Sequence, residues 1–333
     1  MTGISVVICC YNSSTRLKET LEGLSRQSLK GIPWEIVLVD NGSTDDTINT
    51  AISEWNNYAK HDVKLIIVKE SRQGLSFARE SGIIKAQHEL ILFCDDDNWL
   101  DDHYLEIAHQ IMADNPGVGG LGGHNIGVCD SGRFPEWWDE YQQGYAVGRQ
   151  AEHNGILKHR MYLWGAGLVS RKSLLLKTFD SRYPSLLKDR SGNELSSGGD
   201  SEICARILLL GYSLYYDDRL KLKHYMTNDR LQLKYRERLF DGHTKSLGVL
   251  REYHDVIVYN SMSFFTKLGI VLESLFFIFA ISLKISGRGK QQYYNNLYKI
   301  FNWNAIPASA TVRGIVEFKD FSVNQKKKIA YNG

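Results

Sequence analysis

The chain has 333 residues, of which 43% are hydrophobic and 23% are charged, and its formal net charge is +2. This length is enough to bury one or two substantial cores, and only five prolines argue against long disordered linkers. Five scattered cysteines disfavour a disulfide framework, and no secretory signal pattern opens the sequence, so we expect a cytoplasmic protein.

The first hundred residues alternate between short apolar runs and helical patterns. The apolar runs predict strands covered on both faces at 4–10, 35–39, 63–68 and 89–94. Helices are predicted between them: one after the cap candidates Ser13 and Ser14, a second with Asp45 and Asp46 in its first turn, and a third over 75–86. In the second helix we expect Ile48, Ile52 and Trp55 to face inward. Repeated βα units predict an α/β fold with a mostly parallel central sheet flanked by helices.

The pattern becomes less regular after residue 117. A glycine-rich stretch at 117–127 and an aromatic-rich stretch at 128–162 show no clear period, and a short strand then ends at Ser170. A helix is predicted to begin near Asp200, and two short strands at 212–216 and 220–224 are predicted to be joined by a turn. We therefore expect a domain at 1–228, with halves at 1–117 and 118–228, and a helical region at 229–333.

Three adjacent carboxylates, Asp95, Asp96 and Asp97, follow the fourth predicted strand. Ligands of open α/β sheets bind beyond the carboxyl ends of the strands, where Asp40 also lies. Carboxylates this close repel one another unless they are protonated or bridged by a cation, and oxygen-rich sites suit Mg²⁺ or Mn²⁺. The alternative is an acidic helix start, since two more aspartates follow at 101 and 102.

Six short motifs follow one another along the first 225 residues: Val6–Asn12, Val39–Thr47, Gly74–Arg79, Cys94–Asp97, Trp164–Gly167 and Gly198–Glu202. Each motif alone is weak, but together they resemble the family-2 inverting glycosyltransferases, which have the Rossmann-like GT-A fold of nucleotide-diphospho-sugar transferases. The resemblance implies a nucleotide-binding half at 1–117 and a half at 118–228 for the acceptor and the catalytic base.

The resemblance also implies the residues that contact a nucleotide-sugar donor, with UDP as the expected nucleotide. These residues are Cys10, Tyr11, Asn12, Asp40, Gly42, Arg72, Arg79, Asp95, Asp96, Gly165 and Ala166. Arg79 has a second interpretation, as the partner in a structural ion pair. Asp95 and Asp97 resemble the two carboxylates of the family's DxD motif, which hold a Mn²⁺ or Mg²⁺ ion that bridges the diphosphate. His224 resembles a histidine that completes the metal shell, although a strand-end histidine is more often a surface or core residue.

Inversion requires a base that takes the proton of the acceptor hydroxyl. Asp200 matches the family's acidic motif and is our candidate, with Glu202 as a rival and helix capping as the structural alternative. The sequence departs from the family here, because the family often has Glu-Asp and this chain has Gly199 before Asp200. Trp137, Trp138 and Trp164 are candidate acceptor or sugar contacts, with core packing as the alternative.

Residues 262–285 are strongly apolar, and the chain beyond residue 218 is basic. Glu273 near the middle of the apolar run disfavours a membrane-spanning helix, whereas basic residues up to 290 suit anionic headgroups. We expect peripheral contact with the inner face of the cell membrane through 262–290, with a packed core or dimer helix as the alternative, and no nucleic-acid partner.

The function that follows is metal-dependent inverting transfer of a sugar to a hydroxyl of a glycan or lipid-linked acceptor, in polysaccharide or glycoconjugate biosynthesis of the cell envelope. Two alternatives stay open. A metal-dependent nucleotidyltransferase would also use an aspartate-rich strand end, and a nucleotide-sugar-binding protein that has lost catalysis would explain Gly199.

Overall fold

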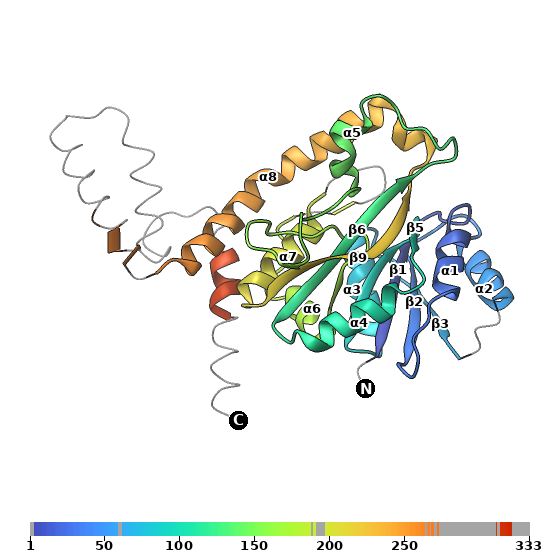
Figure 1. The fold of residues 1–333 in the computed structure, drawn as a ribbon, viewed down its shortest axis with the longest axis horizontal. Helices are drawn as coiled ribbons and strands as arrows, with labels where there is room; N and C mark the ends of the chain where they lie inside the picture. The colour runs from blue at the N-terminus through green and yellow to red at the C-terminus, as the bar shows by residue number, and fades with distance from the viewer. Residues whose placement is uncertain are drawn as a thin grey trace. The chain divides into compact units, whose positions relative to one another are not determined.

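The computed structural model describes residues 3–58, 62–187, 189–190, 197–263, 265–266, 268–269, 272, 311 and 314–321. The chain divides into two compact units, Met1–Leu247 and Gly248–Gly333. All strands that the structure describes belong to one nine-stranded sheet in the first unit (Figure 1).

The amino-terminal half of the sheet is parallel and agrees closely with the predicted strands. It consists of β1 (Ile4–Cys10), β2 (Trp34–Asp40), β3 (Lys64–Lys69) and β4 (Leu90–Asp95), in the order β3-β2-β1-β4. The connecting helices are α1 (Leu17–Ser25), α2 (Thr47–Asn57) and α3 (Leu75–Lys85). In this register Cys10 pairs with Asp40 and Cys9 pairs with Asp95, so three strand ends meet at one edge.

Beyond β4 the sheet has both strand directions, in the order β4-β8-β6-β9-β5, with β7 paired to β9. β8 is antiparallel to β4 and β6, whereas β6 and β9 are parallel to each other. The remaining elements, in chain order, are β5 (Asn98–Leu100), α4 (Tyr104–Asp114), β6 (Val118–Val128), α5 (Trp138–Tyr141), η1 (Gln142–Tyr145), β7 (Gly155–Ile156), β8 (Val169–Arg171), α6 (Lys172–Thr178), α7 (Gly199–Leu209), β9 (Ser213–Tyr225), η2 (Asn228–Leu231) and α8 (Leu233–Ser261). The expected mixed α/β architecture is confirmed.

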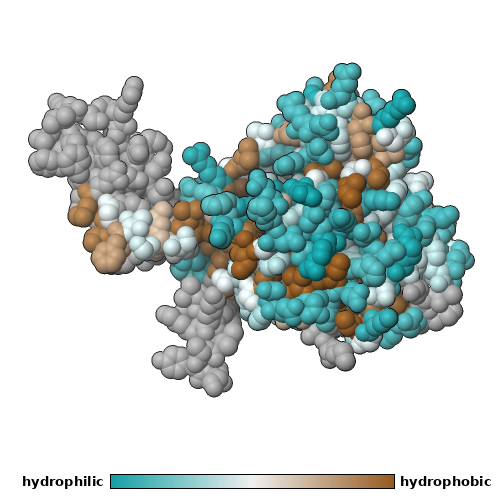
Figure 2. Space-filling view, viewed as in Figure 1, coloured by the Kyte–Doolittle hydropathy of each residue, from teal (hydrophilic) through white to brown (hydrophobic). Residues whose placement is uncertain are grey.

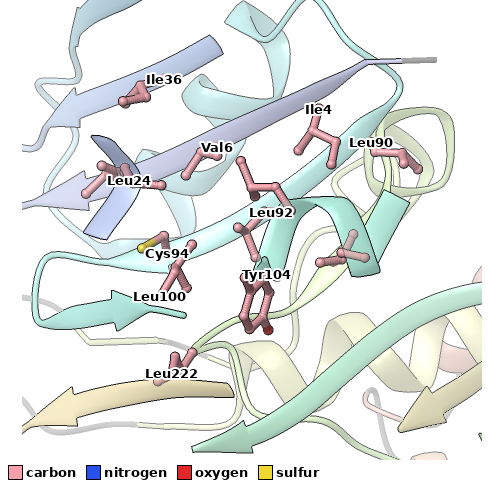
Figure 3. Packing of buried hydrophobic residues seen from close by; sticks show 14 of the residues in the cluster. Ile4, Val6, Leu24, Ile36, Leu90, Leu92, Cys94, Leu100, Tyr104 and Leu222 are labelled. Carbon is pink, nitrogen blue, oxygen red and sulfur yellow. The ribbon is translucent and has the colours of Figure 1, made fainter. Parts of the chain in front are cut away.

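Two apolar cores cover the two faces of the sheet. Alternate residues of β1 face opposite sides: Ile4, Val6 and Ile8 join a core with residues of α1, α2 and α4, whereas Val7 joins a core with residues of α3, α6 and α7. Figure 3 shows the first core, in which Tyr104 lies near Leu222. The surface seen in Figure 2 is mostly hydrophilic with small apolar patches.

Several local predictions were wrong. The two short strands expected at 212–216 and 220–224 are one strand, β9, which pairs with β6 across a register shift between Gly122 and His124. The glycine-rich stretch expected to be irregular is the eleven-residue β6, and a Cβ at Gly123 would overlap the carbonyl oxygen of Leu220. The glycine is required because the two backbones approach closely there.

Two helix predictions also need correction. The buried face of α2 consists of Thr47, Ala51 and Trp55, while Ile52 is 41% exposed. Neither candidate serine provides a side-chain cap for α1, because the hydroxyl of Ser13 donates to Asp96 instead.

The apolar segment at 262–285 lies largely outside the described residues, as does most of 262–290. Among the residues that the structure does describe, no helix has both the length and the apolar character needed to cross a bilayer.

Candidate active site

The loops that follow β1 and β2 are tied to each other at the carboxyl edge of the sheet. The side-chain oxygen of Asn12 accepts a hydrogen bond from the amide of Thr44 at 2.8 Å, and the Asn12 amide donates to the Ser43 hydroxyl at 3.0 Å. Asp40 accepts from the Ser43 amide at 3.2 Å, and this turn contains Gly42 with φ +80°. Cys10 is buried at the end of β1, while Tyr11 is 42% exposed beside it. These five of the eleven predicted donor-contacting residues are therefore neighbours.

Of the three aspartates at the end of β4, Asp96 and Asp97 form ion pairs with different arginines. Asp96 accepts from Arg16 at 2.7 Å and from the hydroxyl of Ser13. Asp97 pairs with Arg230 of η2 at 2.6 Å, and His224 of β9 lies 3.4 Å from its other carboxylate oxygen. Asp96 and Asp97 are thus fixed by residues from different parts of the chain.

Electrostatics distinguishes Asp95 from Asp97. Burial alone would raise the pKa of Asp97, but Arg230 and His224 lower it well below the ordinary carboxyl range. Burial raises the pKa of Asp95, and the charge of Asp97 raises it further, while Arg79 opposes both. The ionised form of Asp95 is therefore disfavoured, whereas that of Asp97 is stabilised.

Two protein donors at this place would be available to a metal ion. No group of three His, Cys, Asp or Glu side chains suited to a metal occurs among the described residues. The Nε2 atom of His224 and the Oδ1 atom of Asp97 are 3.4 Å apart, and Oδ1 also accepts from the side-chain amide of Asn98 at 3.0 Å. The Nδ1 atom of His224 is buried and has no hydrogen-bond partner among the described residues. Two donors of one octahedral ion lie about 3 Å apart, so the pair fits an ion whose other ligands are phosphate oxygens and water.

Arg79 lies between the aspartate cluster and α7. Its side chain is 5% exposed, and its Nη1 atom pairs with Asp189 at 3.2 Å. Burial would lower the pKa of Arg79, but the negative charges of Asp189, Asp95 and Asp200 together raise it. A Cβ on Gly165 would overlap the Nη2 atom of Arg79, so the guanidinium reaches from Asp189 to the backbone at Gly165.

Arg72, the other arginine predicted near the nucleotide, has a different environment. Its side chain is 52% exposed and pairs with Glu70 at 2.8 Å and Glu80 at 3.2 Å. The guanidinium also lies 4.6 Å from the ring centre of Phe77.

Asp200 and Glu202 stand in the first turn of α7 but face different surroundings. Asp200 accepts from the amide of Gly165 at 2.7 Å and from its own neighbour Ser201 at 2.8 Å. Glu202 is 2% exposed and pairs with Arg206 at 2.8 Å. It also accepts from the amides of Leu186 and Leu187 and from the hydroxyl of Ser185. Asp200 thus faces the segment at 164–167, whereas Glu202 is enclosed by the chain at 185–187.

The segment around Gly165 forms one wall beside Asp200. Trp164 is 6% exposed and its amide donates to Gln150 at 2.8 Å, while the carbonyl of Ala166 accepts from Asn125 at 3.3 Å. The guanidinium of Arg160 lies 4.9 Å from the ring centre of Trp164, and its buried Nη2 atom has no hydrogen-bond partner in the part of the chain that the structure describes.

Two of the three tryptophans expected at the acceptor, Trp137 and Trp138, belong to a separate aromatic cluster. Trp138 is 4% exposed and stacks on Phe134 with ring centres 4.2 Å apart. Trp137 contacts Tyr141 and Tyr145, and Arg236 of α8 lies 5.0 Å from its ring centre. This cluster joins α5 and η1 to the start of α8.

Sequence reasoning did not identify Arg16, Arg230, Asp189 or Arg160. They come from a helix entry, a 3₁₀ turn and two irregular segments, where no motif signals them. The only available signal was charge balance, because a buried carboxylate needs a counter-ion.

Comparisons with known proteins agree on one family. The model of glycosyl transferase family 2 matches residues 5–175. The putative glycosyltransferase EpsH of Bacillus subtilis (strain 168) is 34% identical over 103 residues, which are 31% of this chain and 28% of that protein. The chain matches about a third or less of the length of the first curated relatives.

Solved structures share the fold at low identity. S. aureus TarS 1–349 in complex with UDP-GlcNAc has a TM-score of 0.53 and 17% identity, over 90% of this chain and 80% of that one. The mannosyltransferase PcManGT from Pyrobaculum calidifontis, in complex with GDP-Man and Mn²⁺, has a TM-score of 0.51 and 16% identity, over 95% of this chain and 74% of that one. Because the family match spans just over half of the 333 residues, the chain belongs to glycosyl transferase family 2.

Proposed function

We propose that the chain transfers a sugar, with inversion, from a nucleoside-diphosphate donor to a hydroxyl of a glycan or lipid-linked acceptor. The observation that carries the proposal is the position of Arg79, whose buried guanidinium lies 5.2 Å from the ring centre of Phe93 on β4 and beside Gly165, the residue whose amide donates to Asp200 of α7. The donor edge and the candidate base thus border one site. UDP is the favoured nucleotide, since TarS 1–349 binds UDP-GlcNAc.

Asp97 and His224 would hold a divalent ion, Mn²⁺ or Mg²⁺, together with the donor diphosphate. When bound, such an ion offsets the negative charge that develops on the departing nucleoside diphosphate. Arg230 and Arg16 would hold Asp97 and Asp96 in place, because each guanidinium fixes one carboxylate oxygen. Asp95 is then the carboxylate that faces Arg79 and the sugar.

Asp200 acts as the base in this proposal. The acceptor oxygen attacks the anomeric carbon from the face opposite the diphosphate, and its proton passes to the Asp200 carboxylate. As the new C–O bond forms, the bond to the diphosphate breaks and its electron pair leaves with the diphosphate. The amide of Gly165 orients Asp200 through the 2.7 Å hydrogen bond. Glu202 suits this role less, because four donors already enclose it.

For the acceptor, we propose contacts with a tryptophan of the site and with the C-terminal segment. Trp164 borders Asp200 through Gly165 and is the tryptophan best placed for a sugar, while Trp138 contributes mainly packing. Contact with the inner face of the membrane through 262–290, in cell-envelope polysaccharide assembly, rests on the sequence of that segment.

A donor screen tests the proposal. Purified protein would be incubated with UDP-, GDP- and dTDP-sugars and membrane lipid extract, with Mn²⁺, Mg²⁺ or EDTA, while the nucleoside diphosphate released is measured. Metal-dependent release of the diphosphate with a glycosylated product is expected. Release of pyrophosphate would identify a nucleotidyltransferase instead, and donor binding without any release would identify a binding protein.

A further inference from the structure

The carboxylate of Asp189 lies against the backbone of Gly199, directly before the proposed base. A Cβ placed on Gly199 would overlap Oδ2 of Asp189, and the next nearest atoms are also those of the Asp189 side chain. Gly199 therefore has to lack a side chain for Asp189 to stay where it is. The same carboxylate pairs with Arg79 at 3.2 Å, and its side chain is 8% exposed.

This contact involves Gly199, the position at which the chain departs from the family motifs. An acidic residue is expected before Asp200, and the chain has a glycine. The space that a side chain at 199 would enter holds the carboxylate of Asp189 from a segment ten positions earlier. The negative charge has not been lost from the site. It comes from a different part of the chain.

We propose that Asp189 is a positioning residue of the donor site, which replaces in space the acidic side chain missing at 199 and acts through Arg79. The inference rests on the proposed function. Asp189 fixes one edge of the guanidinium at Nη1, which leaves Nη2 beside Gly165. Arg79 is thereby held between Asp95 and Asp200 without pairing fully with either.

The charges around Arg79 explain why such an anchor matters. A buried guanidinium strongly favours a carboxylate partner, and Asp200 and Asp95 are both near enough to influence it. Without Asp189, Arg79 would be drawn toward these two carboxylates. An ion pair between Arg79 and Asp200 would occupy the carboxylate that has to receive the acceptor proton. Asp189 thus keeps the base available.

The backbone holds Asp189 from both sides. The amide of Leu75, the first residue of α3, donates to the carbonyl of Arg190 at 3.0 Å. Two residues before Asp189, the amide of Leu187 donates to Glu202 at 2.9 Å. Glu202 therefore has a defined task in this arrangement, which is to fix the chain that carries the anchor.

Relocation of the carboxylate tests the inference. The variants are Asp189→Gly, Asp189→Asn, Gly199→Glu and the double change Asp189→Gly with Gly199→Glu. We expect each single change to lower kcat by about 10²-fold, since a small displacement near the chemistry has this effect, with a smaller change in KM for the donor. The double variant should recover at least tenfold over Asp189→Gly. Asp180→Asn, which removes a carboxylate paired with Arg182, is the control and should leave kcat unchanged.

A stability cycle separates this inference from the proposed function. Gly199→Glu alone should lower Tm because of the overlap, and Asp189→Gly should relieve that loss in the double variant. If the wild-type protein transfers no sugar, the proposed function fails. The stability cycle still tests whether a side chain at 199 and the carboxylate of Asp189 occupy the same space. If the wild type is active and the double variant is no better than Asp189→Gly in kcat, or if Asp189→Asn behaves as the wild type, the positioning role is overturned.

Discussion

Replacement of Glu202 by Gln separates the structural carboxylate of α7 from the catalytic one. Glu202 and Arg206 form an ion pair at 2.8 Å with side chains 2% and 3% exposed. Two backbone amides and a serine hydroxyl also donate to Glu202, so a glutamine would direct an NH₂ group at a donor. The substitution removes the charge and misplaces one hydrogen bond at the same time.

The expected loss of stability can be worked out from these contacts. Removal of one partner from a buried ion pair costs about 3–5 kcal/mol. Arg206 keeps hydrogen bonds to the carbonyls of Thr178, Tyr183 and Pro184, which favours the lower end, about 3 kcal/mol. At about 2–4 °C per kcal/mol for a domain of this size, Tm should fall by about 6–12 °C.

Calorimetry and initial rates measured well below Tm would be compared with those of Asp200→Asn. The asparagine keeps an acceptor for only one of the two backbone amides that Asp200 binds, so its Tm should fall by about 2–4 °C, the effect of one lost hydrogen bond worth about 1 kcal/mol. Its kcat should fall by about 10²–10⁴-fold, the usual contribution of a general base. Glu202→Gln should lose less than this factor. A folded Glu202→Gln protein without turnover, beside an active Asp200→Asn protein, would refute the assignment.

Three further outcomes follow from the site and the sheet. Asp97→Ala should abolish Mn²⁺-dependent donor binding in titration calorimetry, and unchanged affinity would remove the metal assignment. Asp95→Asn should raise the Tm of metal-free protein at pH 7. Burial and the charge of Asp97 raise the pKa of Asp95, so its ionised form opposes folding above its ordinary pKa of about 4. An equal or lower Tm would contradict this. Gly123→Ala should lower Tm by at least about 5 °C, because a Cβ would overlap Leu220, whereas the open position Gly117→Ala serves as control.

The parallel half of the fold was predictable because its strands are covered on both faces. Such strands appear as continuous apolar runs, and β1 was predicted at its observed limits, Ile4–Cys10. The second half follows a different rule. Glycines let β6 pack closely on β9, and Asp217 is satisfied within β9 by Arg219 at 2.9 Å rather than by a turn. Composition typical of loops therefore hides the longest strand pairing in the sheet.

The site residues also divide into those that the sequence predicts and those that it does not. Residues at the ends of strands, such as Asp40 and Asp95, can be inferred because the topology brings the carboxyl ends of parallel strands to one edge. Arg16, Arg230 and Asp189 contact that edge from segments with no period and no motif, at separations of up to 133 residues. Only the folded chain shows which arginine meets which aspartate.

The balance of these charges explains why a divalent ion is expected. Five carboxylates border the described site, Asp95, Asp96, Asp97, Asp189 and Asp200, and four arginines lie around them, Arg16, Arg79, Arg160 and Arg230. One negative charge is left over, and a donor diphosphate adds more. A diphosphate would be repelled from such a site in the absence of a further cation, since like charges in a poorly hydrated site repel strongly. We therefore expect metal and donor to bind together, with little affinity for either alone.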